Sequence, residues 1–205
     1  MQSSGCNFSF MDYIYKINKR KIELDNLADF EQDKDISVII PTYNEQECIS
    51  NMVKSIRNFL KSKKYEIIIV DDNSSDNTPK IIDSYFTNDI VALHRYHKRG
   101  IFSAIQDGIK VARGNTVIIM DADFSHPPSK IQEMLKYIDD YDIVTGSRFA
   151  KKGGVEAPFI RKSCTLLLNL VLRIFLFDLG VTDFTGGFHA IKRDKFLDID
   201  FKYPP

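Results

Sequence analysis

The chain has 205 residues, and its 28 lysines and arginines balance its 28 aspartates and glutamates, so the formal net charge is zero. This length fits one domain. The neutral balance argues against a nucleic-acid partner, which requires a clustered basic face. With 43% hydrophobic and 27% charged residues, the composition is that of a folded globular protein rather than a disordered chain.

The sequence shows no signal peptide and no membrane span. Residues 1–21 are too polar to contain the apolar segment of a signal peptide. The most apolar stretch, residues 164–180, is interrupted by Asn169, Arg173 and Asp178. It therefore falls short of the roughly 18 consecutive apolar residues that a transmembrane helix requires.

The first 35 residues differ from the rest of the chain and are interpreted as an N-terminal extension. Apolar residues between Met11 and Leu27 show a weak helical period, which predicts a surface helix there. Residues 36–205 form the second unit, in which short apolar runs alternate with stretches of helical period.

The apolar runs of the second unit have the length and composition of buried strands. They cover residues 36–40, 66–70, 90–93, 116–120 and 142–144. After the first run, apolar residues spaced by three and four predict a helix, and Asn44 and Glu47 fit a capping box at its start. Alternation of strands and helices predicts an α/β fold with a mostly parallel sheet. Ligands of such sheets bind beyond the carboxyl ends of the strands.

Four of the predicted strands are followed by polar clusters. These are the sequences PTYNE at 41–45, DDNSSD at 71–76, DADFSH at 121–126 and GSR at 146–148. Any one cluster is explained by turn formation or helix capping. Core packing requires none of them, so four clusters around one predicted crevice indicate a functional site.

Asp121 and Asp123 are the most informative pair, because they follow an apolar strand with one residue between them. Side chains two apart on an extended backbone share a face. Carboxylates that share a face repel each other unless a cation lies between them, and Mg²⁺ combines carboxylate oxygens with substrate phosphates. The glycine-rich motifs GxxxxGK[ST] and GxGxxG are absent from the sequence, which disfavours a P-loop NTPase and a nicotinamide dehydrogenase.

Five ordered motifs carry a family resemblance. They are ISVIIPTYNE, EIIIVDDNSSDNT, GNTVIIMDADFSHPP, DIVTGSRF and VTDFTGGF. In this order they resemble the family 2 glycosyltransferases, and most closely the dolichol-phosphate mannose synthases and related polyprenyl-phosphate glycosyltransferases. The resemblance implies a glycosyltransferase A fold, a nucleotide-sugar donor, a divalent metal (Mg²⁺ or Mn²⁺) and a polyprenyl or dolichyl phosphate acceptor.

The same resemblance implies roles for individual residues. Asp123 and Arg148 would be catalytic, and the metal would be held by Asp123 with Asp121 and Ser125. The nucleotide sugar would contact Pro41, Tyr43, Glu45, Val70, Asp72, Asp121, Ala122, Asp123 and Arg148. Relatives have a glycine at the position of Phe102 and commonly an arginine at that of His189, which changes the loop and the charge near the donor.

A later segment is apolar on most sides, yet Arg161, Thr165, Asn169 and Arg173 are spaced by four and form one polar stripe if it is helical. Two interpretations fit this pattern equally: a helix lying in a membrane interface, or a core helix with a solvated stripe. The family resemblance favours the first, and implies that Arg161 and Thr165 hold the acceptor phosphate.

The resemblance predicts a metal-dependent, inverting transfer of a sugar, with mannose from GDP-mannose favoured, to a dolichyl or polyprenyl phosphate. We expect a protein associated peripherally with the cytoplasmic side of a membrane. One alternative is a glycosyltransferase that uses a UDP-sugar or a non-lipid acceptor. Another is a nucleotide-sugar-binding domain without turnover, because relatives continue beyond residue 205 and the domain is predicted to be truncated at its C-terminal end.

Overall fold

The computed structural model describes residues 14–17, 20–23, 33–85, 87–96, 100–149, 159–175 and 181–199. For residues 14–17, 20–23, 159–163 and 173 it describes the backbone alone. The strands are β1 (Ile14–Ile17), β2 (Arg20–Glu23), β3 (Lys34–Thr42), β4 (Tyr65–Asp71), β5 (Ile90–His94), β6 (Gly114–Ile119), β7 (Ile143–Thr145) and β8 (His189–Lys192). The helices are α1 (Ile49–Leu60), α2 (Thr78–Asp83), α3 (Ile101–Val111), the 3-10 helix η3 (Pro128–Lys130), α4 (Ile131–Met134), α5 (Phe159–Phe175) and α6 (Arg193–Leu197).

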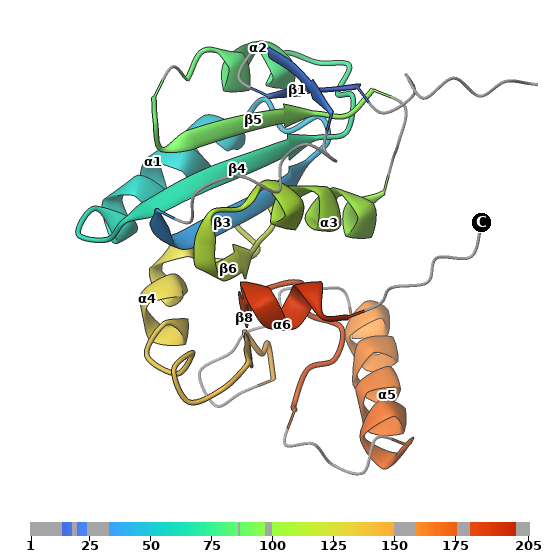
Figure 1. The fold of residues 1–205 in the computed structure, drawn as a ribbon. Helices are drawn as coiled ribbons and strands as arrows, with labels where there is room; N and C mark the ends of the chain where they lie inside the picture. Colours follow the sequence, from blue (N-terminus) through green and yellow to red (C-terminus); the bar gives the residue numbers. More distant parts are fainter. Residues whose placement is uncertain are drawn as a thin grey trace, which may run out of the picture.

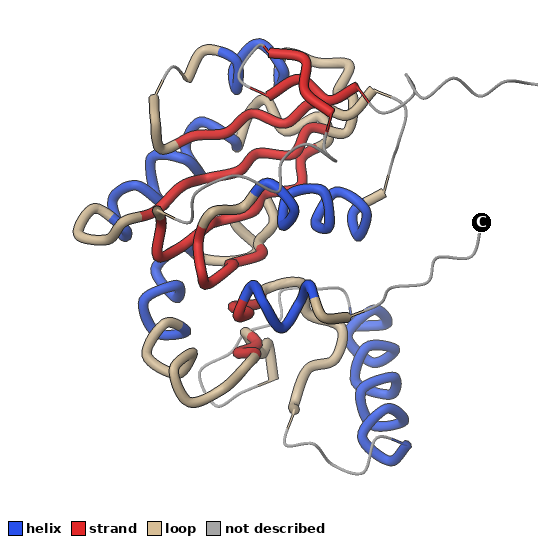
Figure 2. The backbone as a smooth tube through the Cα atoms, in the orientation of Figure 1, coloured by secondary structure: helices blue, strands red, loops and turns tan. Residues whose placement is uncertain are grey.

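One sheet of eight strands, in the order β2-β1-β5-β4-β3-β6-β8-β7, forms the centre of the molecule (Figures 1 and 2). Its four middle strands, β5, β4, β3 and β6, are parallel. Strand β8 runs antiparallel to β6, and β7 pairs antiparallel with β8. The predicted α/β class and all five predicted strands are confirmed.

Alternating side chains of the middle strands pack into two separate cores. Val38 and Ile40 face the side covered by α1, where Met52 is also buried. Ile39, which lies between them in sequence, faces the side covered by α3 and α6. Successive residues of a strand point to opposite faces. A sheet with helices on both faces therefore requires the continuous apolar runs that the sequence contains.

Three local expectations are wrong, and one strand was not predicted. Residues 14–17 and 20–23 form a hairpin, β1 and β2, that pairs with β5, so the predicted surface helix is not present over these residues. Strand β8 has no counterpart among the predicted strands. Strand β7 was expected to be buried and parallel, but it is a partly exposed edge strand. Helix α1 has Cys48 at its N-cap without a side-chain cap bond, so Asn44 and Glu47 form no capping box.

The amino ends of three middle strands are joined through a buried carboxylate. Glu66 on β4 accepts hydrogen bonds from the hydroxyl of Ser37 on β3 at 2.7 Å and from the backbone N–H of Arg113 at 2.6 Å. The guanidinium of Arg113 also donates to Glu66, at 2.9 Å from Nε. Ser37 in turn accepts the N–H of Gly114 at the start of β6. Every charge in this network is paired, which is the condition for burying a carboxylate.

We predict that Glu66→Ala lowers the free energy of unfolding by about 2–4 kcal/mol, because it leaves the Arg113 cation and the Ser37 hydroxyl without their buried acceptor. Urea denaturation followed by circular dichroism measures the change. Lys130→Ala is the control, since it breaks an exposed pair with Glu133 and is expected to cost less than about 0.5 kcal/mol. Equal denaturation midpoints for the two variants would contradict this role of Glu66.

Candidate active site

The loops that follow β3 and β4 are held together by hydrogen bonds at the carboxyl edge of the sheet. The backbone N–H of Asn44 donates to Ser74 Oγ, and the N–H of Ser75 donates to Asn44 Oδ1, both at 2.9 Å. The N–H of Glu45 donates to the hydroxyl of Thr78 at 2.9 Å. Asn44 has a φ of 57°, a left-handed conformation that asparagine tolerates better than most residues. These contacts fix Glu45 at the edge of the site.

Asp72 is held by a cation that the sequence analysis did not single out. Arg95 Nη1 lies 2.5 Å from Asp72 Oδ1, and the backbone N–H of Gly100 donates to Oδ2 at 2.9 Å. Arg95 is itself buried and also reaches Ser103 Oγ, at 2.6 Å. Burial raises the pKa of Asp72, and the Gly100 and Arg95 contacts only partly oppose that shift. Both carboxylate oxygens therefore have a partner, and each keeps a lone pair for a ligand.

Asp121, Ala122 and Asp123 form a tight acidic turn after β6. The backbone N–H of Ser125 donates to Asp123 Oδ1 at 2.9 Å. Burial raises the pKa of Asp123, but bonds from the Ser125 N–H and hydroxyl outweigh that effect and lower it. Phe124 between them has a φ of 64°, which is strained for a bulky side chain. Such strain, of order 1–3 kcal/mol, is typical of turns that serve a site.

His126 closes this turn. The backbone N–H of Asp121 donates to His126 Nδ1 at 3.0 Å, so this nitrogen carries no proton. The imidazole stacks on Phe188, with ring centroids 5.2 Å apart and planes 12° from parallel. Burial lowers the pKa of His126, which favours the neutral form that the hydrogen bond needs.

Glu45 and the acidic turn lie close enough to interact electrostatically. The pKa of Glu45 is raised, first by burial and then by the charges of Asp123 and Asp121. The described residues contain no group of three or more histidine, cysteine or acidic side chains arranged as a metal site. Two carboxylates with an unbalanced negative charge nevertheless suit Mg²⁺ or Mn²⁺, which take their remaining ligands from water and phosphate.

Arg148 projects toward the same region and is paired with Asp183. Its Nε donates to Asp183 Oδ2 at 2.8 Å and its Nη2 to Oδ1 at 2.9 Å, a two-point contact. The Asp183 side chain is fully buried, whereas that of Arg148 is 39% exposed. Hydrogen bonds from Arg148 overcome the effect of burial and lower the pKa of Asp183 to about 2. The charge of Arg148 also helps to lower the pKa of His126, which places the two groups near each other.

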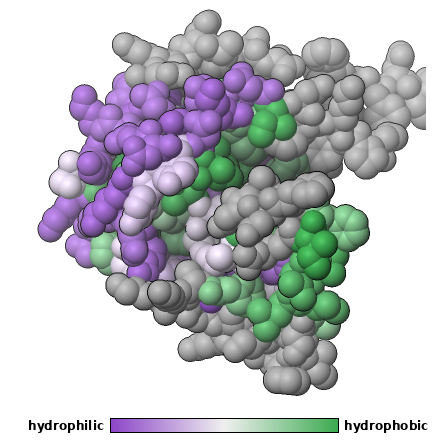
Figure 3. Space-filling model, turned by 90° about the horizontal axis from the view of Figure 1, so that it is seen from below, coloured by the Kyte–Doolittle hydropathy of each residue, from purple (hydrophilic) through white to green (hydrophobic). Residues whose placement is uncertain are grey.

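Helix α5 buries a polar side chain and exposes apolar ones. Asn169 is buried, at 4% exposure, while seven apolar side chains of the helix are 39–74% exposed. These are Leu166, Leu167, Leu168, Leu170, Val171, Ile174 and Phe175. Figure 1 shows α5 set apart from the sheet, and its apolar side chains form the green surface on the right of Figure 3. Within the described residues, α5 is therefore not packed as a core helix with a solvated stripe.

The predicted site residues not yet described fall into three groups. Pro41 and Tyr43 line the carboxyl end of β3, as Glu45 does, with Tyr43 half exposed. The side chains of Val70 and Ala122 are buried in the two cores, which leaves only their backbone groups for a ligand. Thr165 is partly buried on α5, and Arg161 lies on the same helix, with its side chain outside the described part of the structure.

The structure places Phe102 and His189, the two residues that differ from the pattern expected of the family. Phe102 lies in the first turn of α3 rather than in a loop. His189 lies on β8, where its Nδ1 is 3.2 Å from the hydroxyl of Thr145 on β7. Burial lowers the pKa of His189, so this position carries no extra positive charge near neutral pH.

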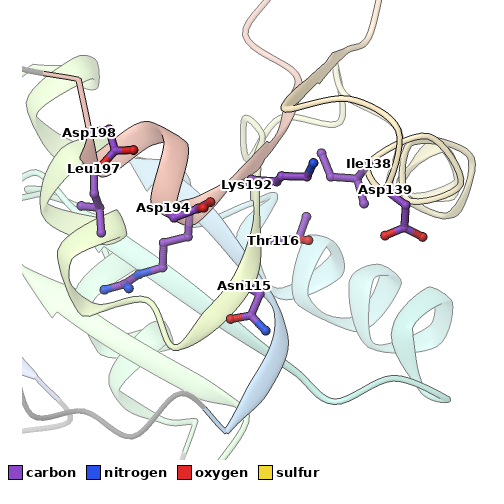
Figure 4. Close-up of a pocket in the computed structure, with 9 residues that line it drawn as sticks. Asn115, Thr116, Ile138, Asp139, Lys192, Asp194, Leu197 and Asp198 are labelled. Carbon is purple, nitrogen blue, oxygen red and sulfur yellow. The ribbon is translucent and has the colours of Figure 1, made fainter.

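A pocket of about 620 Å³ lies elsewhere in the fold (Figure 4). Asn115 and Thr116 at the start of β6 line it, together with Lys192 at the end of β8 and Asp194 on α6. The amino end of β6 is the sheet edge opposite to the acidic turn, so this pocket is separate from the candidate site.

Arg95 and Asp183 are site residues that were not predicted from the sequence, and Asn169 was predicted only as part of a polar stripe. Asp183 lies within the quoted motif VTDFTGGF, and an acidic residue in an otherwise apolar and glycine-rich motif was the available signal. Arg95 follows a predicted strand, as the acidic clusters do, and this position could have indicated it.

The model of the family described as glycosyl transferase family 2 matches residues 37–199. The chain belongs to glycosyltransferase family 2. The resemblance seen in the five motifs is therefore confirmed.

Two curated relatives act on polyprenyl phosphates according to their names. The dolichol-phosphate mannosyltransferase of Pyrococcus furiosus is 37% identical over 163 residues, which cover 78% of this chain and 46% of the relative. The undecaprenyl-phosphate 4-deoxy-4-formamido-L-arabinose transferase of Proteus mirabilis is 31% identical over 152 residues, which cover 71% of this chain and 45% of the relative. The chain thus spans less than half the length of these relatives.

Solved structures with the same architecture are more distant in sequence. Glucosyl-3-phosphoglycerate synthase from Mycobacterium tuberculosis, in complex with Mn²⁺, UDP and phosphoglyceric acid, aligns with a TM-score of 0.61 and 19% identity, covering 83% of this chain and 60% of that one. Mannosyl-3-phosphoglycerate synthase from Rubrobacter xylanophilus aligns with a TM-score of 0.65 and 18% identity. The alignment covers 81% of this chain and 55% of that one. The predicted glycosyltransferase A fold is confirmed.

We predict that His126→Asn keeps the Asp121 amide protected from hydrogen exchange, because the asparagine Oδ1 can take the place of the imidazole Nδ1. His126→Gln extends its amide further and is expected to lose that bond, so exchange at Asp121 rises roughly three- to tenfold. Both variants lose the stacking on Phe188, so each serves as the other's control for that contact. The same Asp121 exchange rate in both would show that Nδ1 is not the acceptor that holds the turn.

Proposed function

We propose that the chain carries the donor site of a glycosyltransferase that moves a sugar from a nucleotide diphosphate to a polyprenyl or dolichyl phosphate, with inversion at the anomeric carbon. Mannose from GDP-mannose is the favoured donor. The observation that carries the proposal is the pairing of two features. An acidic turn with unbalanced charge lies near Arg148, whose charge acts on His126 of that turn, and hydrogen bonds through Thr185 link Arg148 to a helix with seven exposed apolar side chains.

On the donor side, the residues of the carboxyl edge bind and orient the nucleotide sugar. Asp72, fixed by Arg95 and Gly100, offers a rigid acceptor for the N–H groups of a base. Asp121 and Asp123, with Ser125, would hold Mg²⁺ or Mn²⁺, which neutralises charge on the departing diphosphate when bound. His126 keeps the acidic turn in one conformation through the Asp121 N–H.

On the acceptor side, an oxygen of the lipid phosphate attacks the anomeric carbon while the bond from that carbon to the diphosphate oxygen breaks. This phosphate is already anionic near neutral pH, so the step needs no strong general base. Arg148, Arg161 and Thr165 would orient the incoming phosphate, and the rate would come from positioning and charge neutralisation. The nucleoside diphosphate leaves with the electron pair of the broken bond.

The exposed apolar face of α5 supports contact with a membrane surface. A helix with a polar side held by the protein and an apolar side turned outward suits an orientation in the membrane interface. In the described part of the chain, no helix is long and apolar enough to cross a bilayer. Placement on the cytoplasmic side of the membrane stays a prediction.

We predict that Asp123→Asn lowers metal-dependent transfer by at least roughly a hundredfold, since it removes a charge that faces the diphosphate. The assay follows labelled sugar from GDP-mannose or UDP-glucose, with and without Mg²⁺ or Mn²⁺ and with and without polyprenyl phosphate. Asp139→Asn, at the separate pocket, is the matched control and should be fully active. Transfer by Asp123→Asn at the control rate would refute the assignment.

The arms of this assay separate the alternatives. Sugar transfer that requires the lipid phosphate supports the proposal, and preference for a UDP-sugar would correct the donor. Metal-dependent sugar release without any need for the lipid would point to another acceptor. Nucleotide-sugar binding without release in any arm would identify a binding domain.

We predict that Leu167→Gln combined with Phe175→Gln weakens binding to vesicles of phosphatidylcholine and phosphatidylglycerol by at least roughly a hundredfold. Each exposed side chain that enters the bilayer contributes about 1.5–3 kcal/mol. Vesicle flotation measures the bound fraction, and Tyr141→Gln, an exposed apolar residue outside α5, is the control. Equal flotation of the unaltered protein, the double variant and Tyr141→Gln would exclude α5 as the element that contacts the membrane.

A further inference from the structure

Three oxygen atoms accept hydrogen bonds from the guanidinium of Arg148, and all three lie on the segment that follows α5. Its Nε and Nη2 bond the two oxygens of Asp183, and Nη2 also donates to the hydroxyl of Thr185 at 2.6 Å. The backbone N–H of Arg148 reaches Asp183 Oδ2 as well, at 3.2 Å. Because a two-point contact fixes both the position and the plane of a guanidinium, this segment sets where Arg148 points.

Asn169 on α5 contacts the same segment. Asn169 Oδ1 accepts the backbone N–H of Phe184 at 2.7 Å, and Asn169 Nδ2 lies 3.4 Å from the hydroxyl of Thr185. Nδ2 also donates to the carbonyl of Thr165, one turn earlier on the helix, at 2.9 Å. Among the α5 side chains that the structure describes, Asn169 alone is buried.

Thr185 connects the two halves of this arrangement. Its hydroxyl receives the bond from Arg148 and donates to Asp183 Oδ1 at 3.1 Å, and it also lies 3.4 Å from Asn169 Nδ2. A continuous series of polar contacts therefore runs from α5 through Asn169 and Thr185 to the guanidinium of Arg148. Seven of the described apolar side chains of α5 are exposed, so the contacts seen at this junction are polar ones.

We propose that Asn169 and Asp183 are positioning residues that couple the placement of α5 to the orientation of the Arg148 guanidinium. The proposal rests on the proposed function for its consequence: a helix seated at the membrane surface would set the arginine that meets the acceptor phosphate. Asp183 acts on Arg148 directly, whereas Asn169 acts at a distance through Thr185. Neither residue needs to touch a substrate.

Hydrogen exchange tests the coupling without any assay of transfer. In Asn169→Ala, the Phe184 amide loses its acceptor directly. The proposal adds that the Arg148 amide, which Asn169 does not touch, also exchanges faster, roughly three- to tenfold, as expected for the loss of one hydrogen bond. Leu170→Ala is the matched control, because this neighbour on α5 is 56% exposed.

A second variant guards against general loosening of the helix. Asn169→Asp keeps an oxygen for the Phe184 amide but removes the Nδ2 donor that faces Thr185. We expect protection of Phe184 to persist while exchange at Arg148 rises. Unchanged exchange at Arg148 in both Asn169 variants would overturn the proposal, and so would an equal rise in Leu170→Ala.

Kinetics provide a readout that a purely structural role would not change. We expect Asn169→Ala to raise the KM for polyprenyl phosphate roughly three- to tenfold and to leave the KM for the nucleotide sugar unchanged. Added to Arg148→Lys, which already lacks the two-point contact, the same change should have little further effect. Fully additive losses would contradict the coupling.

The two proposals fail in different ways. If no transfer to polyprenyl phosphate is observed, the proposed function fails, and the exchange rates still decide whether Asn169 positions Arg148. If transfer is observed but exchange at Arg148 is insensitive to Asn169, the coupling fails and the proposed function stands.

Discussion

A sheet covered by helices on both faces leaves polar chemistry only the ends of its strands, and this constraint shapes the whole molecule. The strands β3, β4 and β6 are apolar through their middle residues and become polar where they leave the two cores. At the amino ends, the charge of buried Glu66 is neutralised by Arg113 in a structural contact. At the carboxyl ends, the charges of Glu45, Asp121 and Asp123 remain unbalanced and are open to a ligand.

The neutral net charge of the chain is an average over regions of different character. Negative charge gathers at the acidic turn, while Arg95 and Arg148 enter the same neighbourhood already paired with Asp72 and Asp183. Pairing fixes a guanidinium in place without using all of its donors, since arginine has five N–H groups. The site thus combines an unneutralised anionic surface with positioned cations, an arrangement suited to a ligand that carries both a metal ion and phosphates.

The sequence predicted the features of this fold that depend on local pattern. Continuous apolar runs specify strands buried on both faces, so the parallel sheet and the clusters at its strand ends follow from residues close together in the chain. Pairings between distant segments leave no such signature. Nothing near Arg148 indicates Asp183, 35 residues later, as its partner. The short strand β8 and the hairpin of β1 and β2 depend on neighbours in the sheet rather than on their own composition.

The capping box failed for a similar reason. Asn44 has the right residue type and spacing to begin α1, but its side chain bonds Ser75 across the site instead. The tertiary contact joins two loops that must stay together, and the helix begins at Ile49 without a side-chain cap. Local rules are expected to yield where a functional site imposes its own geometry.

The polar attachment of α5 has a thermodynamic consequence. Exposure of apolar surface raises the heat capacity on unfolding, whereas exposure of polar groups lowers it slightly. Among the described side chains of α5, Asn169 is the buried one, and its bond to the Phe184 amide exposes little apolar surface when it breaks. A local opening of this contact is therefore expected to change the heat capacity little and to lie beneath the cooperative transition of the sheet. The stability of the domain and the freedom of its outermost helix are therefore set separately, by different kinds of contact.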